Sequence, residues 1–253
     1  FLSGEEVPGV TARLADALKF SGIISLIYGA FCFLLPNTPP KADAVETLAF
    51  KKAFNLFSNK SFLVLVLASL GVSIIHQIYF LQTGPFLSSI GIKDSSIGPA
   101  MTIGQFAEIA TMAYLGFFLK RLGFKKVITI GIFAYFARYM IFGTSFLPTW
   151  VMVMSQAFHG FCFAFFFAAG FIYVDKLADD DVRHSAQTVF GIIIFGGGPV
   201  VGGWLSGYLQ NIYTLDGVFN YSSFWYTLAG IGLVVTLLFY SSFNSTLSKE
   251  TAS

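Results

Sequence analysis

Charge is scarce in this 253-residue chain, and so is cysteine. Charged residues make up 11% of it, whereas a soluble globular domain carries roughly 25%, so the composition excludes an ordinary water-soluble protein. The formal net charge is only +2, which gives no reason to expect a nucleic acid partner. Cys32 and Cys162 lie in apolar runs, and we interpret them as small hydrophobic residues, not as a disulfide or a metal pair.

A recognisable signal peptide is also lacking. The first ten residues, FLSGEEVPGV, contain no basic segment that leads into a short apolar core. The chain starts with Phe1 where a complete protein would start with methionine. We therefore expect it to begin partway through a longer protein.

Long apolar runs, in contrast, are abundant. About seven of them are long enough for a tilted transmembrane helix, and none shows the alternation of a barrel strand. The predicted spans are residues 20–36, 61–82, 97–119, 127–147, 150–174, 187–209 and 222–243. A polar stretch at 37–60 separates the first span from the other six. Many secondary transporters consist of two six-helix halves joined by such a loop.

The distribution of basic residues predicts the orientation. If the stretch 37–60 is cytoplasmic, the short loops on the opposite face contain a single basic residue, Lys93. This asymmetry obeys the positive-inside rule and places the C-terminus in the cytoplasm. The basic residues on the cytoplasmic side are then Lys41, Lys51, Lys52, Lys60, Lys120, Arg121, Lys125, Lys126, Lys176, Arg183 and Lys249.

Glu108 is the most informative residue, because it lies near the middle of the otherwise almost uncharged span 97–119. A carboxylate at that depth is costly and usually faces a cavity or the bundle interior. Gln105 lies one helical turn earlier on the same face. Burial disfavours the charged form of Glu108, so this residue could carry a proton. The alternative is a protonated structural acid that bonds a neighbouring helix.

The segment 116–126 resembles the short cytoplasmic signature of the major facilitator superfamily: glycine, three residues, an acid, arginine, any residue, glycine and then basic residues. Lys120 stands where the acid is usual. The alternative interpretation is a plain positive-inside anchor. The matching residues are Gly116, Lys120, Arg121, Gly123, Lys125 and Lys126.

A resemblance to the nucleoside–proton symporter family, the nucleoside permeases of that superfamily, covers nearly the whole chain. Five features carry it by their order and spacing: LLPNTPP at 34–40, Gln105 and Glu108 in one span, Arg138, the HGFCF segment at 159–163, and VDKLADDDVRHSAQ at 174–187.

That resemblance implies a binding site near the midplane, between the two halves of the transporter. The substrate-binding residues would be Gln77, Gln105, Glu108, His159 and Phe163. His159 stands where the family often has a tyrosine, and Phe80 where an asparagine contact is expected. Amides, a carboxylate and an aromatic face suit a nucleoside, although a sugar would be served almost as well.

Several other intramembrane residues have competing interpretations. Arg138 needs a partner at its depth, and a structural role is favoured because the fourth span of such a half is usually peripheral. His76 and His159 are either proton relays or hydrogen-bonding core residues. The glycines at 196–198 and 202–203 permit close helix packing. The aspartates at 179–181 are expected to form a solvated turn, not a metal site.

We therefore predict an all-α polytopic membrane protein with the major facilitator superfamily fold. Residues 1–36 would hold the last span of the N-terminal half, 37–60 the cytoplasmic central loop, 61–246 the C-terminal six-helix bundle and 247–253 a cytoplasmic tail. The predicted function is proton-coupled nucleoside uptake across the inner or plasma membrane. The alternatives are a sugar or oligosaccharide symporter and a non-transporting sensor.

The expected partners follow from this function. They are a nucleoside, a proton, the lipid bilayer and the missing N-terminal half of the same chain. We expect a monomer, and we expect no cofactor, no metal and no enzymatic activity, because no nucleophile–base pair or metal cluster stands out in the sequence.

Overall fold

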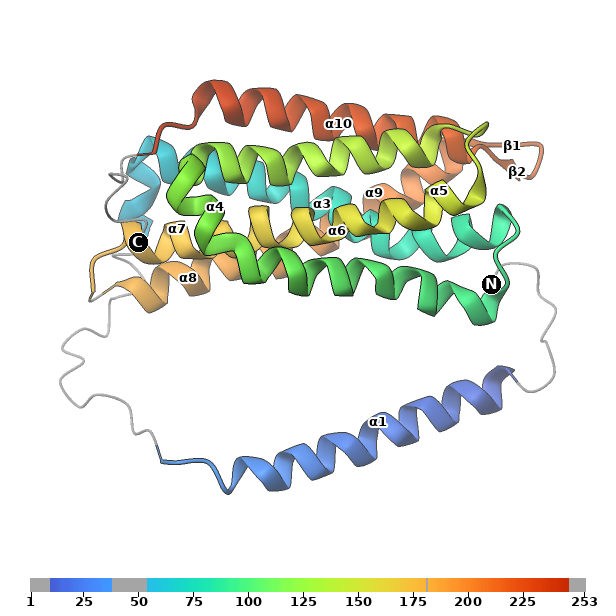
Figure 1. Ribbon diagram of the computed structural model, residues 1–253, viewed down its shortest axis with the longest axis horizontal. Helices are drawn as coiled ribbons and strands as arrows, with labels where there is room; N and C mark the ends of the chain where they lie inside the picture. Colours follow the sequence, from blue (N-terminus) through green and yellow to red (C-terminus); the bar gives the residue numbers. More distant parts are fainter. Residues whose placement is uncertain (1–9, 38–53, 181, 246–253) are drawn as a thin grey trace. The chain divides into compact units, whose positions relative to one another are not determined.

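The computed structural model describes residues 10–37, 54–180 and 182–245, which belong to two compact units (Figure 1). The described helix of the first unit is α1 (Val10–Cys32). Its apolar part, Leu18–Cys32, is shorter than the predicted span 20–36. The helix ends early because Pro36 disfavours helical backbone at Leu35 before it. The loop residues 38–53 and the tail 247–253 lie outside the described residues.

The second unit is almost entirely helical. Its described part contains five helical stretches long and apolar enough to cross a membrane: Lys60–Ser89, Asp94–Gly143, Thr149–Leu177, Arg183–Ile212 and Tyr221–Ser242. The first is α3, the second α4 and the last α10; a 3-10 turn, η1 (Leu56–Ser58), precedes α3.

The other two stretches are composite. One consists of α5 (Thr149–Met154), η2 (Ser155–Ala157), α6 (Phe158–Phe161), η3 (Cys162–Ala168) and α7 (Ala169–Leu177). The other consists of α8 (Arg183–Ile192), η4 (Ile193–Gly197) and α9 (Gly198–Ile212). Both η3 and η4 are π-helical turns, a geometry that often marks functional sites.

Helix α4 bends sharply at Gly123. This glycine has φ 76° and ψ 165°, so the 50-residue element is two helices joined at one residue (Figure 1). Glycine tolerates positive φ because it has no Cβ. The bend separates the predicted spans 97–119 and 127–147. The five stretches therefore contain the six apolar runs that the sequence predicts for this unit.

The helices of the second unit run side by side along its long axis. Helix α10 packs along α4 and also contacts α3, while α9 packs along α3. Elements α6 and η3 pack against α4. Trp225 of α10 is fully buried and its ring stacks on Tyr139 of α4, with centroids 5.5 Å apart. This packing buries a common core of aliphatic and aromatic side chains.

Two local features connect sequence to structure at the helix ends. Asn59 caps α3, because its side-chain oxygen accepts hydrogen bonds from the backbone of Ser61 and Phe62. A short antiparallel hairpin of β1 (Thr214–Leu215) and β2 (Val218–Phe219) lies before α10. Its Asp-Gly turn has positive φ at both residues, the usual geometry of a two-residue hairpin. This hairpin was not predicted from the sequence.

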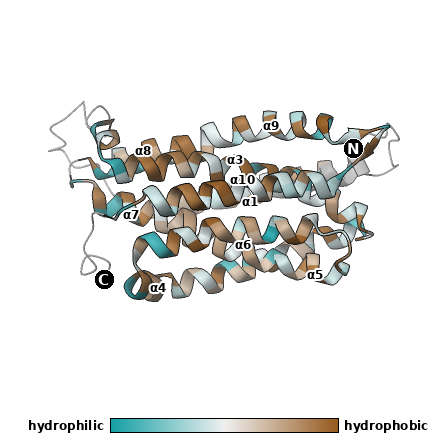
Figure 2. Ribbon diagram, turned by 90° about the horizontal axis from the view of Figure 1, so that it is seen from above, coloured by the Kyte–Doolittle hydropathy of each residue, from teal (hydrophilic) through white to brown (hydrophobic). Residues whose placement is uncertain are grey.

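Hydrophilic residues gather at one end of the second unit, where α4 bends and where α7 is followed by α8 (Figure 2). The bend contains the basic motif, and Arg183 opens α8. The middle parts of the helices are mostly apolar, as a bilayer requires.

Candidate functional site

One cavity in the second unit contains all five predicted substrate-binding residues. It has a volume of about 350 Å³. It is lined by Ser73, His76, Gln77, Phe80, Gln105, Glu108, His159, Phe163, Phe167, Ile194, Phe195 and Pro199.

The spacing of these residues follows helical geometry. Ser73, His76, Gln77 and Phe80 occupy positions i, i+3, i+4 and i+7 of α3 and therefore share one face. Gln105 and Glu108 are one turn apart on α4.

His159 of α6 is followed at four-residue intervals by Phe163 and Phe167 of η3. The π-helical turn η4 and the start of α9 supply the remaining wall.

Glu108 is the carboxylate of the cavity. Its side chain is 22% exposed, and its Oε2 atom lies 3.7 Å from Nε2 of the buried His159. Among the described residues, the side chains of Gln77 and Gln105 make no hydrogen bond within the protein, and both are at least partly exposed. The carboxylate and the two amides are therefore free to bind polar groups of a solute.

Close backbone approach brings Glu108 and His159 together. A Cβ atom added to Gly160 would lie 2.5 Å from the carbonyl group of Ala107 and 2.7 Å from the backbone nitrogen of Glu108. No side chain fits there, so α6 contacts the backbone of α4 directly at this point. Glycine at this position allows the approach.

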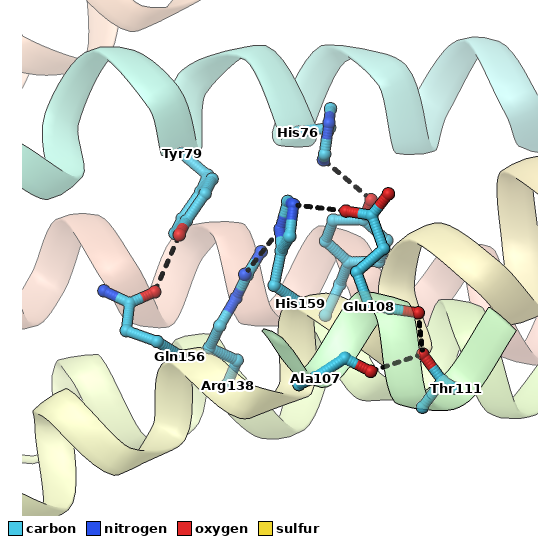
Figure 3. Close-up of polar contacts among 9 residues, drawn as sticks. His76, Tyr79, Ala107, Glu108, Thr111, Arg138, Gln156 and His159 are labelled. Atoms are coloured by element: carbon cyan, nitrogen blue, oxygen red, sulfur yellow. Dashed lines mark hydrogen bonds and ion pairs between the residues drawn. The ribbon is translucent and has the colours of Figure 1, made fainter. Parts of the chain in front are cut away.

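The ring of His159 packs against rings from α3. Its ring stacks near those of His76 and Tyr79, each with centroids 5.6 Å away. Figure 3 shows Glu108 and Arg138 on opposite sides of the His159 ring, with Tyr79 extending from α3 towards Gln156. His159 thus lies between the carboxylate of the cavity and a buried cation.

Arg138 is fully buried. Its Nη1 atom lies 3.3 Å from Nδ1 of His159. Its guanidinium carbon lies 3.8 Å from the ring centroid of Tyr79 and within 5.5 Å of the rings of Tyr135 and Tyr139. Within the described residues, neither an acid nor a helix carbonyl pairs with it.

His76 also belongs to this polar cluster. Its Nδ1 atom lies 2.8 Å from the hydroxyl of Tyr135, and its ring contacts Phe80 and Phe167 edge-on. Tyr79 donates a hydrogen bond of 2.7 Å to Oε1 of Gln156. The hydroxyls of Tyr135 and Tyr79 therefore form hydrogen bonds to side chains on other helical elements.

The basic motif lies apart from the cavity, around the bend of α4. Gly116 has open space beside it, and Lys120 and Lys126 are exposed. The guanidinium of Arg121 lies over the ring of Phe117 at 5.6 Å, on its own helix. Lys125 lies 5.0 Å from the ring of Tyr240 on α10 and contacts Oδ1 of Asn244 at 3.5 Å. The motif thus connects the α4 bend to the end of α10.

The loop between α7 and α8 is held by Arg183. This residue forms an ion pair of 2.5 Å with Asp180 and donates a hydrogen bond to the backbone oxygen of Asp175. Gln187 donates to the side chain of Asp175 at 2.9 Å. In the described residues, no group of three acidic, histidine or cysteine side chains could hold a metal; Asp181 lies outside them.

The sequence analysis did not assign several residues of the cavity wall. Ser73 and His76 share the helical face of Gln77, so the spacing could have identified them. Phe195 could not be identified in this way, because η4 is a π-helical turn that departs from the regular period. Ser73 also donates a hydrogen bond to the backbone oxygen of Ile194, which attaches η4 to α3.

The fold and cavity define an all-α polytopic membrane protein of the major facilitator type. The chain belongs to the nucleoside–proton symporter family: the family model described as "Nucleoside H+ symporter" matches residues 13–247. The family predicted from the sequence is thereby confirmed.

Individual relatives agree with this placement. The chain is 30% identical to the nucleoside permease NupG of Escherichia coli (strain K12), covering 96% of this chain and 60% of NupG. It is 29% identical to the xanthosine permease of the same organism, covering 87% and 56%. A crystal structure of the nucleoside transporter NupG superposes with a TM-score of 0.71 at 28% identity, covering 88% and 58%. The chain spans less than two thirds of these relatives.

Proposed function

We propose that the complete protein containing this chain takes up nucleosides together with protons by alternating access. Family membership and the names of the relatives support this proposal. The observation that carries it is the cavity, where the five residues implied by the family resemblance line one space. The rest of the protein would supply the other side of the site.

The cavity suits a nucleoside better than a sugar. The amides of Gln77 and Gln105 and the carboxylate of Glu108 can bind ribose hydroxyls and base edges. Phe163, Phe167 and Phe195 add aromatic rings to the same cavity. A flat base gains from stacking on such rings, and a sugar has no matching planar group.

Glu108 is the proposed proton-coupling residue. It is the one acidic side chain among the cavity-lining residues that the structure describes. A dry, closed cavity favours its protonated form, and a wet, open cavity favours the carboxylate. Substrate binding and proton binding are thereby coupled at one side chain.

We place the protein in the cell membrane with the C-terminus and the basic α4 bend in the cytoplasm, and we propose that it works as a monomer. The residues of the bend motif, Gly116 to Lys126, would act at the cytoplasmic gate. The basic α4 bend and the α7–α8 loop occupy one end of the unit (Figure 2), which supports this orientation.

Nucleoside counterflow tests the proposed function. Proteoliposomes with the complete protein, preloaded with unlabelled nucleoside, should accumulate labelled nucleoside, and excess sugar should not compete. Competition by sugars but not by nucleosides would favour a sugar symporter. Nucleoside binding without counterflow would favour a sensor.

Replacing Glu108 tests the coupling. Glu108→Gln should abolish accumulation driven by a proton gradient while nucleoside exchange continues, because the amide binds hydroxyls but takes up no proton at physiological pH. Asp94→Asn is the matched control, since Asp94 is an exposed acid on the same helix, outside the cavity. Undiminished accumulation by Glu108→Gln would remove Glu108 from the coupling step.

A further inference from the structure

Within the described residues, Arg138 is a cationic group buried without an acidic partner. Its side chain has no solvent-exposed surface, and in the described part of the chain its Nε and Nη2 atoms have no hydrogen-bond partner. Ring faces of three tyrosines surround the guanidinium, and such contacts stabilise a desolvated cation. Burying a cation in this way is costly, which suggests that its contact with His159 has a role.

That contact determines which nitrogen of His159 carries the proton. A guanidinium has only donor groups, so Nδ1 of His159, 3.3 Å from Arg138 Nη1, must accept the hydrogen bond. The proton of the neutral ring then lies on Nε2. This atom is the one that faces Glu108, 3.7 Å from its Oε2 atom.

The same contact opposes a doubly protonated ring. An imidazolium would direct an Nδ1 proton at the donors of Arg138 and add a second positive charge beside a buried cation. The other titratable groups near the ring are His76 and Tyr79 on α3 and Glu108 on α4. Of these, Glu108 alone adds negative charge when it ionises at physiological pH.

We propose that Arg138 is a positioning residue for proton coupling, which keeps His159 neutral with its Nε2–H directed at Glu108. A proton that enters the cavity is then held by Glu108 and not by His159. The carboxylate form of Glu108 gains a donor in a fixed direction. This inference rests on the proposed function of Glu108, but the state of His159 can be measured without any transport assay.

A purely structural role for Arg138 predicts a different result. If Arg138 only fills the bundle interior, its removal lowers stability but leaves the tautomer and titration of His159 unchanged. If Arg138 positions His159, removing Arg138 changes which nitrogen of His159 carries the proton. The state of the ring therefore separates the two roles.

The first measurement uses the unaltered complete protein labelled with ¹⁵N-histidine. Nitrogen chemical shifts distinguish the two neutral tautomers from imidazolium, and the loss of one signal set in His159→Gln assigns His159 among the three histidines of this chain. We expect the neutral Nε2–H form throughout about pH 8 to about pH 5, where an ordinary histidine titrates. An Nδ1–H tautomer or an imidazolium in this range would overturn the proposal.

The second measurement uses Arg138→Met, which removes the donor and the charge but keeps much of the volume. We expect His159 to titrate within the same range, and the pH for half-maximal proton-driven accumulation to move by about one unit, a tenfold change in proton concentration. Lys93→Met is the matched control, because Lys93 is an exposed cation at the start of the same helix.

The possible results distinguish failure of this proposal from failure of the proposed function. Continued nucleoside exchange would show that Arg138→Met is folded, and an unchanged His159 spectrum in that variant would refute the positioning role. If Arg138→Met does not fold, the spectrum of the unaltered protein still tests the proposal, because an Nδ1–H tautomer or an imidazolium there would refute it. If the protein does not transport nucleosides at all, the proposed function fails, while the histidine spectrum still tests the Arg138–His159 contact.

Discussion

At the scale of single residues, the cavity combines free polar groups with fixed ones. Gln77, Gln105 and Glu108 face open space, whereas His76 and His159 are held by neighbours on other helices. The cavity position of Gln77 and Gln105 was predictable, because polar residues within an apolar span usually face a cavity or the bundle interior. The partner of Arg138 was not predictable, since the pairing depends on how two helices are rotated against each other.

The amides should contribute directly to substrate affinity. Gln105→Ala and Gln77→Ala should each weaken nucleoside binding roughly two- to tenfold, the equivalent of about 0.5–1.5 kcal/mol for one neutral hydrogen bond. Binding of labelled nucleoside to the purified complete protein measures this loss. Gln210→Ala is the control, because Gln210 lies at the far end of α9, outside the cavity. An equal loss in Gln210→Ala would contradict a local contact.

At the scale of elements, glycines determine how closely the helices approach. Gly123 allows α4 to turn back, and Gly160 allows α6 to contact the backbone of α4. The sequence analysis identified Gly123 through its motif but assigned no role to Gly160. A small residue in an apolar run has many possible neighbours, and only the folded chain shows which backbone lies against it.

Gly160→Ala should separate α6 from α4. The added methyl group would overlap backbone atoms that cannot rotate away, so we expect a loss of about 1–3 kcal/mol in stability and weaker proton-coupled uptake as His159 moves from Glu108. Thermal unfolding of the complete protein and vesicle uptake measure the two effects. Gly203→Ala is the matched control, since a Cβ there meets nothing within 4 Å. A Gly160→Ala protein as stable as this control would refute the close contact.

At the scale of the whole molecule, the asymmetry of charge orients the bundle. Lys93 precedes α4 and Lys120 lies near its bend, so the first segment of this helix separates them. Both lysines are exposed. The positive-inside rule places the more basic end in the cytoplasm.

Labelling from one side of the membrane tests this orientation. In a protein without other reactive cysteines, Lys93→Cys should react with an impermeant thiol reagent added outside the cell. Lys120→Cys should react only after the cell is made permeable. The two variants are controls for each other, because both positions are exposed on the same helix. The opposite pattern would reverse the proposed topology.

The sequence by itself determined the membrane character, the apolar runs and the family, because hydropathy and short motifs act locally along the chain. It also identified Glu108 as an improbable charge, and the family resemblance named four residues that line the same cavity. The tertiary structure decided that Arg138 contacts His159, 21 residues away along the chain, and that Phe195 of η4 lines the cavity. Helical periodicity predicts which residues share a face, but packing alone decides which faces meet.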